Sequence, residues 1–123
     1  MTVISSSSAP TFEQGGTFVT GLAAPSRGSR ELSAWRLRLA PGSASPEHKL
    51  THEEVFVALS GRAVATLAGV RHDVAAGDAL LVGPGLPFVL ANEGDEPFEA
   101  VVAMRCGGLA QVGDERFAPP WAQ

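Results

Sequence analysis

The chain has 123 residues, of which 45% are hydrophobic and 18% charged, a composition typical of one globular domain and not of a disordered segment. Its net charge of −4, without a dense cluster of lysine and arginine, argues against a nucleic-acid partner, and no apolar run approaches the roughly 18 residues of a membrane span. The single cysteine, Cys106, rules out an internal disulfide, and residues 1–10 lack the basic start and apolar run of a secretory signal, so a cytoplasmic location is expected.

In chain order, the sequence begins with a polar stretch at residues 1–10, which we predict to be a flexible tail. Alternating or apolar runs then recur about every eight to twelve residues, separated by turns rich in Gly, Pro and Asp. This pattern predicts an all-β barrel over residues 11–106, followed by a segment, 107–123, that packs on the barrel through Phe117 and Trp121. The predicted strands are Thr17–Thr20, Ala34–Leu39, Glu54–Leu59, Ala63–Leu67, Ala79–Val82, Phe88–Ala91 and Phe98–Met104.

One predicted strand, Glu54–Leu59, is apolar on both of its faces apart from Glu54 itself. Successive side chains of a strand point to opposite faces, so the even-numbered residues share one face and the odd-numbered residues share the other. A strand buried on both sides in so small a protein needs cover from its own terminal segments or from a partner subunit. We therefore expect a homodimer.

Two of the three histidines lie in one short stretch, His48–Glu54. On a continuous strand its even-numbered members, His52 among them, would point the same way, although a turn at residues 51–53 would interrupt this arrangement. Imidazole and carboxylate groups on an apolar wall are costly unless each has a partner or a metal, and two imidazoles with one carboxylate are the minimal ligand set of a non-haem iron site. The alternative is a rim histidine, a buried hydrogen-bonded histidine and a salt-bridged glutamate. The spacing is compatible with both interpretations.

Two ordered segments within residues 42–92 resemble the motifs of the cupin family. The first motif is G-(x)5-H-x-H-(x)3-4-E-(x)6-G, and the second is G-(x)5-P-x-G-(x)2-H-(x)3-N. Two motifs in the right order and at the right separation are much more specific than either motif alone. The positions in register are Gly42, His48, Glu54 and Gly61 in the first motif and Gly77, Gly85 and Asn92 in the second.

The resemblance implies an antiparallel jelly-roll barrel with a pocket open at one end, which is the fold class that we expect. Cupins commonly hold one divalent transition metal with two histidines and the glutamate of the first motif and the histidine of the second. Here Leu50 and Phe88 stand in place of two of those histidines, and a glycine replaces the proline of the second motif. His48 and Glu54 remain, with His52 out of register. We therefore expect either no metal or a single divalent transition metal held by His48, His52 and Glu54.

Without a metal, His48 beside Glu54 would form an acid/base pair in a dry pocket. Burial would raise the pKa of the carboxyl group, and the neighbouring charge would raise the pKa of the imidazole. His72 follows the turn at Gly69 and is expected to face solvent. Strand parity predicts that the remaining pocket wall is apolar and consists of Leu37, Leu39, Leu50, Phe56, Phe88, Leu90, Val102 and Met104.

Such a wall suits a small, largely apolar or aromatic metabolite as the ligand. One resulting hypothesis is a metal-independent isomerase, cyclase or dehydratase in which His48 transfers a proton and Glu54 orients it. The alternatives are a non-catalytic ligand-binding cupin and a metal-dependent cupin dioxygenase that uses His48, His52 and Glu54. The fold by itself does not choose between these hypotheses.

Overall fold

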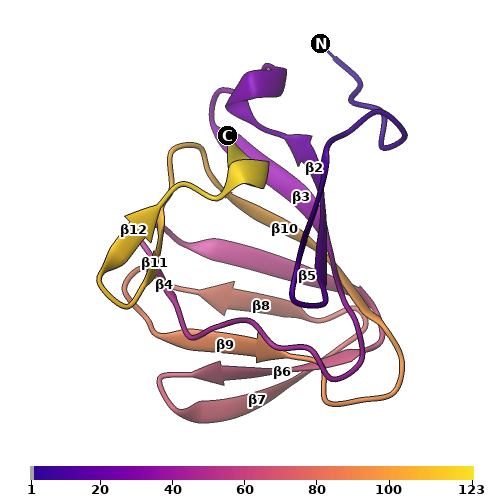
Figure 1. Ribbon diagram of the computed structural model, residues 1–123, viewed down its shortest axis with the longest axis vertical. Helices are drawn as coiled ribbons and strands as arrows, with labels where there is room; N and C mark the ends of the chain where they lie inside the picture. Colours follow the sequence, from indigo (N-terminus) through magenta and orange to yellow (C-terminus); the bar gives the residue numbers. More distant parts are fainter. Residues whose placement is uncertain (1) are drawn as a thin grey trace.

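Short strands carry almost all of the regular structure in the computed structural model, which describes residues 2–123 (Figure 1). The predicted strands are all present, several of them longer than expected: β2 (Thr17–Ala23), β3 (Leu32–Leu39), β5 (Glu54–Ser60), β6 (Arg62–Leu67), β8 (Ala79–Val82), β9 (Phe88–Ala91) and β10 (Phe98–Arg105). The remaining elements are β1 (Thr11–Gln14), β4 (Lys49–Leu50), β7 (Val70–Ala75), β11 (Ala110–Val112), β12 (Glu115–Phe117) and the 3-10 helices η1 (Pro25–Arg27) and η2 (Pro120–Ala122). No helix within residues 2–123 is long and apolar enough to cross a membrane.

Two walls of antiparallel strands face each other. One wall is a six-stranded sheet in the order β1-β2-β3-β10-β5-β8. The other combines the sheets β7-β6-β9 and β12-β11-β4, which two isolated bridges, Ala44↔Ala91 and His48↔Phe88, join side by side. This arrangement confirms the predicted all-β jelly-roll barrel, and it places the chain that precedes β4 next to β9.

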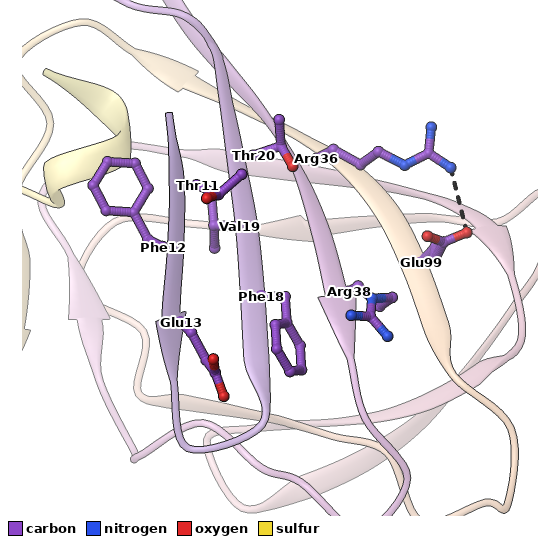
Figure 2. A pocket seen from close by; sticks show the side chains of 9 residues that line it. All are labelled: Thr11, Phe12, Glu13, Phe18, Val19, Thr20, Arg36, Arg38 and Glu99. Atoms are coloured by element: carbon purple, nitrogen blue, oxygen red, sulfur yellow. Dashed lines mark hydrogen bonds and ion pairs between the residues drawn. The ribbon is translucent and has the colours of Figure 1, made fainter. Parts of the chain in front are cut away.

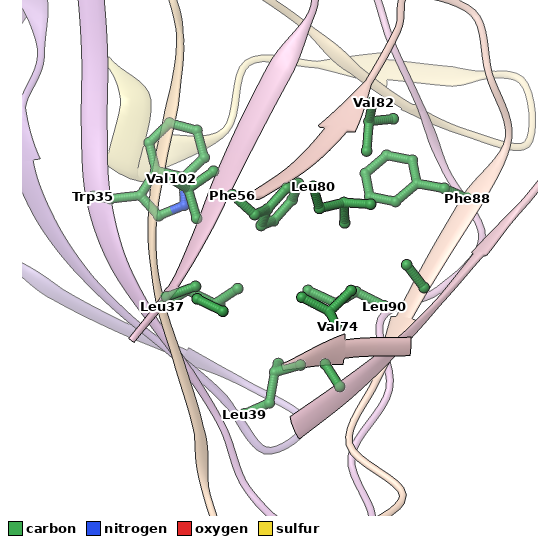
Figure 3. Packing of buried hydrophobic residues seen from close by; sticks show 14 of the residues in the cluster. Trp35, Leu37, Leu39, Phe56, Val74, Leu80, Val82, Phe88, Leu90 and Val102 are labelled. Atoms are coloured by element: carbon green, nitrogen blue, oxygen red, sulfur yellow. The ribbon is translucent and has the colours of Figure 1, made fainter. Parts of the chain in front are cut away.

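The inner faces of the two walls form one hydrophobic core. In β3, Trp35, Leu37 and Leu39 are buried while the arginines between them are exposed, as the two-residue period of a strand requires. Figure 3 shows these side chains directed across the interior toward Phe88 and Leu90 of the opposite wall. The walls therefore meet through side chains from strands that are far apart in the sequence.

The buried Asn92 ties the end of β9 to the neighbouring chain. Its side-chain amide donates hydrogen bonds to the carbonyl oxygens of Leu39 (3.0 Å) and Glu96 (2.7 Å), and its Oδ1 accepts one from the backbone N–H of Gly94 (3.0 Å). The side chain uses both donor hydrogens and one acceptor, which satisfies a polar group that would otherwise be costly to bury. Asn92 therefore has a structural role in the barrel.

The turn between β5 and β6 requires glycine at position 61. Gly61 has φ +77°, and a Cβ placed there would lie 2.2 Å from the carbonyl oxygen of Pro97. Gly69, in the β6–β7 turn, also has a positive φ of +83°, but a Cβ there would meet nothing within 4 Å. The two positions share the backbone conformation and differ in the space around them.

We predict that Gly61→Ala lowers the free energy of unfolding by about 3 kcal/mol or more, because it adds a backbone clash to the strain of a positive φ. Gly69→Ala, the matched control, should lose only about 1 kcal/mol. Denaturant unfolding followed by circular dichroism measures both values. Equal losses in the two variants would contradict the role assigned to Pro97.

Candidate functional site

A cavity of about 240 Å³ lies between the two walls of the barrel. Six of the eight predicted wall residues line it: Leu37, Leu39, Leu50, Phe56, Phe88 and Leu90. The prediction is corrected for Val102 and Met104, which are buried in the core and do not line the cavity. Parity places both on the inner face, but Val102 is paired with the larger Trp35 and Phe56, and both of these line the cavity. These bulky neighbours therefore separate Val102 from the open space of the cavity.

Part of the cavity lining comes from segments that strand patterns do not assign to a pocket. The β1–β2 hairpin contributes to it, as does the loop at residues 44–46. Strand β11 pairs with β4, which brings residues 107–123 back over the barrel. From this C-terminal segment the lining residues are Ala110, Val112, Phe117, Pro119 and Trp121.

Trp121 anchors the C-terminal segment mainly through packing. Its ring lies edge-on to Phe12, with centroids 6.0 Å apart, and tilted against Trp35 at 6.3 Å. Trp121 Nε1 is buried and has no acceptor within residues 2–123. Hydrogen bonds to backbone carbonyl oxygens also fix this end: the hydroxyl of Ser33 donates to Ala122 at 2.8 Å, and Arg27 Nη2 donates to Trp121 at 3.4 Å.

Glu54 opens strand β5 and places a carboxyl group on the apolar wall. Its register partners are Val82 and Met104, which are both buried and offer no charged partner. The residue is only 5% exposed, and its carboxyl group makes no hydrogen bond within residues 2–123. Burial raises the pKa of Glu54 from its ordinary 4.5 to about 8. Glu54 is therefore mainly protonated at neutral pH, in the direction predicted from the sequence.

His48 lies directly before β4 and packs against Phe88, with ring centroids 4.1 Å apart and the ring planes tilted by 43°. Its Nδ1 lies 2.8 Å from the carbonyl oxygen of Pro46. A carbonyl only accepts, so this contact assigns the proton to Nδ1 and leaves Nε2 as the basic nitrogen of the neutral ring. The carbonyl of Pro46, and not Glu54, therefore orients the imidazole.

The pKa of His48 moves in the direction opposite to the sequence prediction. We expected a neighbouring carboxylate to raise it, but burial lowers it, only partly offset by the hydrogen bond to Pro46. Glu54 contributes nothing to this shift because it makes no contact with the imidazole that favours the charged ring. His48 and Glu54 line the same cavity as two separate polar groups, each in its neutral form at neutral pH.

His52 does not join them. It lies in the bend between β4 and β5, the turn considered above, with Nδ1 2.9 Å from the hydroxyl of Thr51, and it does not line the cavity. His72 is exposed on β7. Within residues 2–123 no group of three or more His, Cys, Asp or Glu side chains is arranged to hold a metal ion. The donors present therefore do not fit a metal held by His48, His52 and Glu54, since two protein ligands are too few for a tight site.

The sequence match decides the family. The family model described as cupin domain matches residues 35–104, more than half of the chain. The chain belongs to the cupin family. This confirms the resemblance carried by the two motifs. No curated protein matches the sequence of this cupin.

Solved structures share the fold of this cupin at low sequence identity. The polyketide cyclase RemF from Streptomyces resistomycificus has a TM-score of 0.77 at 17% identity, over 88% of this chain and 81% of that one. A cupin-superfamily sugar phosphate isomerase from Silicibacter pomeroyi has a TM-score of 0.73 at 19% identity, over 91% and 82%. A Cupin 2 conserved barrel domain protein from Salinispora arenicola reaches 0.67 at 26% identity, over 77% and 80%.

The raised pKa of Glu54 predicts how the stability of this cupin depends on pH. Between pH 4.5 and about 8 the unfolded chain loses this proton while the folded protein keeps it. Its contribution to the free energy of unfolding therefore falls with rising pH by up to about 1.4 kcal/mol per pH unit, and levels off above pH 8. Glu54→Gln should remove this contribution and be more stable than the parent at pH 8. Urea unfolding at several pH values measures the free energy of unfolding of each protein. Glu53→Gln, at an exposed position, is the control. Parallel curves for parent and Glu54→Gln would contradict the burial argument.

A second prediction concerns the two apolar residues at the positions where the motif alignment expects metal-binding histidines. Leu50 and Phe88 line the same cavity as His48 and Glu54. The double substitution Leu50→His and Phe88→His should therefore add two donors to the remaining pair and create a divalent-metal site. We expect Co²⁺ to bind at least about 100-fold more tightly than to the parent, measured by calorimetry and visible absorption. The same double variant carrying His48→Ala should bind more weakly. No gain in affinity would show that the motif alignment is wrong.

Proposed function

We propose that this cupin binds a small, largely apolar metabolite in the barrel and acts on it by metal-independent proton transfer, as an isomerase, cyclase or dehydratase. The observation that carries the proposal is the composition of the cavity. Within residues 2–123 the only ionisable side chains that line it are His48 and Glu54, and the rest of the wall is mostly apolar. Two convergent polar groups in an apolar pocket are typical of a small-molecule site.

The two polar groups have complementary protonation states. The pKa of His48 is lowered by burial, so Nε2 carries a lone pair, while the pKa of Glu54 is raised, so its carboxyl group carries a proton. Environments that move two pKa values in opposite directions produce a base and an acid in one site at neutral pH. We accordingly assign His48 as the base and Glu54 as the acid, in place of the orienting role suggested by the sequence alone.

A carbonyl compound illustrates the reaction. Nε2 of His48 takes a proton from the carbon next to the carbonyl, and the electron pair of that C–H bond forms the carbon–carbon double bond of an enol. Glu54 gives its proton to the carbonyl oxygen. When the ketone is β,γ-unsaturated the enol is a conjugated dienol, so return of the imidazolium proton to its γ carbon, with the enol proton passing back to the Glu54 carboxylate, re-forms the carbonyl, moves the carbon–carbon double bond into conjugation with it and restores both residues. The apolar walls keep water away from the enol.

The size and charge of the cavity define the class of ligand. An apolar cavity of about 150 Å³ is large enough for benzene, so the 240 Å³ found here suits a substituted monocyclic or a small bicyclic molecule. No Lys or Arg side chain lines it within residues 2–123. An uncharged, oxygen-bearing aromatic or alicyclic molecule therefore fits better than a sugar phosphate. The fold is shared with both a polyketide cyclase and a sugar phosphate isomerase, so the choice of ligand class rests on the cavity and not on the fold.

The alternative is a non-catalytic ligand-binding cupin. It is favoured by one observation, the lack of a direct interaction that would hold His48 and Glu54 in a fixed mutual geometry. A metal-dependent dioxygenase is not supported by the donor set around the cavity. The experiment below separates the enzyme from the binding module.

We predict that acetophenone binds in the cavity and exchanges its methyl protons with D2O. The chain has two tryptophans, Trp35 and Trp121, and both line the cavity, so quenching of their fluorescence reports occupancy directly. Proton NMR should show methyl-proton exchange in the presence of the parent protein and a loss of at least about 100-fold in His48→Ala, because general-base catalysis contributes that much or more. Glu54→Gln should also slow exchange, since it cannot supply the proton.

The controls are His72→Ala and Glu53→Gln, which change exposed residues of the same types outside the cavity and should leave exchange unchanged. Ribose 5-phosphate should not quench the tryptophans. Saturable quenching without exchange in the parent would favour the binding module. Absence of saturable quenching by acetophenone, or equal quenching by ribose 5-phosphate, would contradict the ligand class.

A further inference from the structure

A second hollow, of about 340 Å³, adjoins the cavity on the side of the β1–β2 hairpin and the C-terminal helix η2. It is here called the rim hollow, and its lining includes Phe12, Gln14, Thr17, Val19, Pro120 and Trp121. Four of these residues line the cavity as well, namely Gln14, Thr17, Val19 and Trp121. The two spaces therefore meet at one shared set of side chains.

The β1–β2 hairpin supplies the polar part of the rim hollow. Register pairs Gln14 with Thr17 and places both on the same face of the hairpin as the buried Val19. Thr20 points the opposite way, onto the outer face of the sheet that Figure 2 shows. The side chains of Gln14 and Thr17 are therefore directed to the inner side of the wall, where the rim hollow lies.

Backbone hydrogen bonds hold this hairpin at both of its ends. At the turn, the N–H of Ala40 donates to the carbonyl oxygen of Gly16 at 2.9 Å. Beyond the other end, the N–H of Gly21 donates to the carbonyl oxygen of Pro10, also at 2.9 Å. The two polar side chains that flank the turn are thus carried by a fixed backbone before a ligand binds, which lowers the entropic cost of binding.

The rim hollow is amphipathic. Neither Gln14 nor Thr17 makes a side-chain hydrogen bond within residues 2–123, so the amide offers two donors and an acceptor and the hydroxyl offers one of each. The other side is apolar, because the rings of Phe12 and Trp121 lie edge to face with centroids 6.0 Å apart, next to Pro120. A short chain that ends in a polar group can contact both sides.

Charge and size define the part of a ligand that fits. No Lys or Arg side chain lines the rim hollow within residues 2–123, and Glu13, its one ionisable residue, turns its side chain to the outer face as the partner of Phe18. An uncharged group is therefore favoured over a carboxylate or a phosphate. The cavity, at about 240 Å³, is smaller than the roughly 300–1,000 Å³ of common ligand sites, whereas the two spaces together fall within that range.

We propose that the rim hollow is a second subsite, which binds a hydroxyl-bearing chain of the ligand whose ring occupies the barrel cavity. The ligand is then an uncharged ketone with an aromatic or alicyclic ring at one end and a short hydroxylated chain at the other. Gln14 and Thr17 hydrogen-bond to the hydroxyl group, and Phe12 and Trp121 pack on the chain. This subsite rests on the proposed function, because only a ring bound in the cavity places its chain here.

Two para-substituted acetophenones of equal length test the subsite. They are para-(2-hydroxyethoxy)acetophenone and para-propoxyacetophenone, which differ by a hydroxyl group in place of a methyl group. Titrations followed by the indole N–H signals of Trp35 and Trp121 in a proton–nitrogen correlation spectrum give both affinities. Thr17→Val should shift the ratio of the two affinities toward the propoxy compound by about fivefold, the contribution of one ordinary hydrogen bond. Thr20→Val, the matched control on the other face of β2, should leave this ratio unchanged.

A second variant keeps the test decisive if Thr17→Val does not fold. Gln14→Leu, at an exposed position, should shift the affinity ratio in the same direction. Acetophenone itself, which has no chain, separates the subsite from the function assigned to the cavity. An unchanged ratio in both variants, while acetophenone still binds, would overturn the subsite and leave the proposed function standing. Absence of binding by all three ketones would overturn both.

Discussion

Strand β5 sets the constraint on which the rest of this structure depends. Its side chains alternate, so Glu54, Phe56 and Ala58 must point inward whenever Val55, Val57 and Leu59 point outward. Slipping the register by one residue would place the Glu54 carboxyl group on the outer face of the sheet and exchange the contents of the two faces. The inner side chains of this short strand thus set part of the polar and apolar lining of the cavity, while its outer side chains form an apolar surface on the other side of the wall.

In the motif alignment Leu50 and Phe88 stand where two histidines are expected, and apolar side chains at these positions affect the electrostatics of the cavity as well as its donors. Imidazoles or a cation near Glu54 would favour its ionised form and hold its pKa low. With Phe88 packed against His48 and apolar residues around Glu54, desolvation dominates both groups. Apolar residues at these two positions therefore supply no metal donors and leave a neutral imidazole and a neutral carboxyl group in one cavity. This provides a physical link between the degenerate motif and the proposed proton-transfer chemistry.

The sequence predicted those features that follow from local periodicity and from motif spacing. The jelly-roll barrel, the principal strands and most of the apolar wall follow from alternation, which is a property of each strand alone. Strand β4 has only two residues, and β11 and β12 have three each, too few for a periodic pattern. Trp121 reaches the cavity because the C-terminal segment returns over β4, a long-range contact that no local pattern encodes. The lowered pKa of His48 was missed because burial dominates it and Glu54 does not contact the imidazole, whereas the predicted rise assumed a charged carboxylate as its neighbour.

The neutrality of the site also bears on what it can bind. Transfer of a net charge into an apolar cavity costs several kcal/mol unless a partner compensates it. Neither a neutral imidazole nor a protonated carboxyl group compensates a phosphate, whereas both can hydrogen-bond to an uncharged carbonyl or hydroxyl group. An amine could be accommodated only by ionising Glu54, with a proton released at neutral pH. The protonation states that suit proton transfer therefore also select uncharged ligands, so the chemistry and the specificity have the same physical origin in the desolvation of His48 and Glu54.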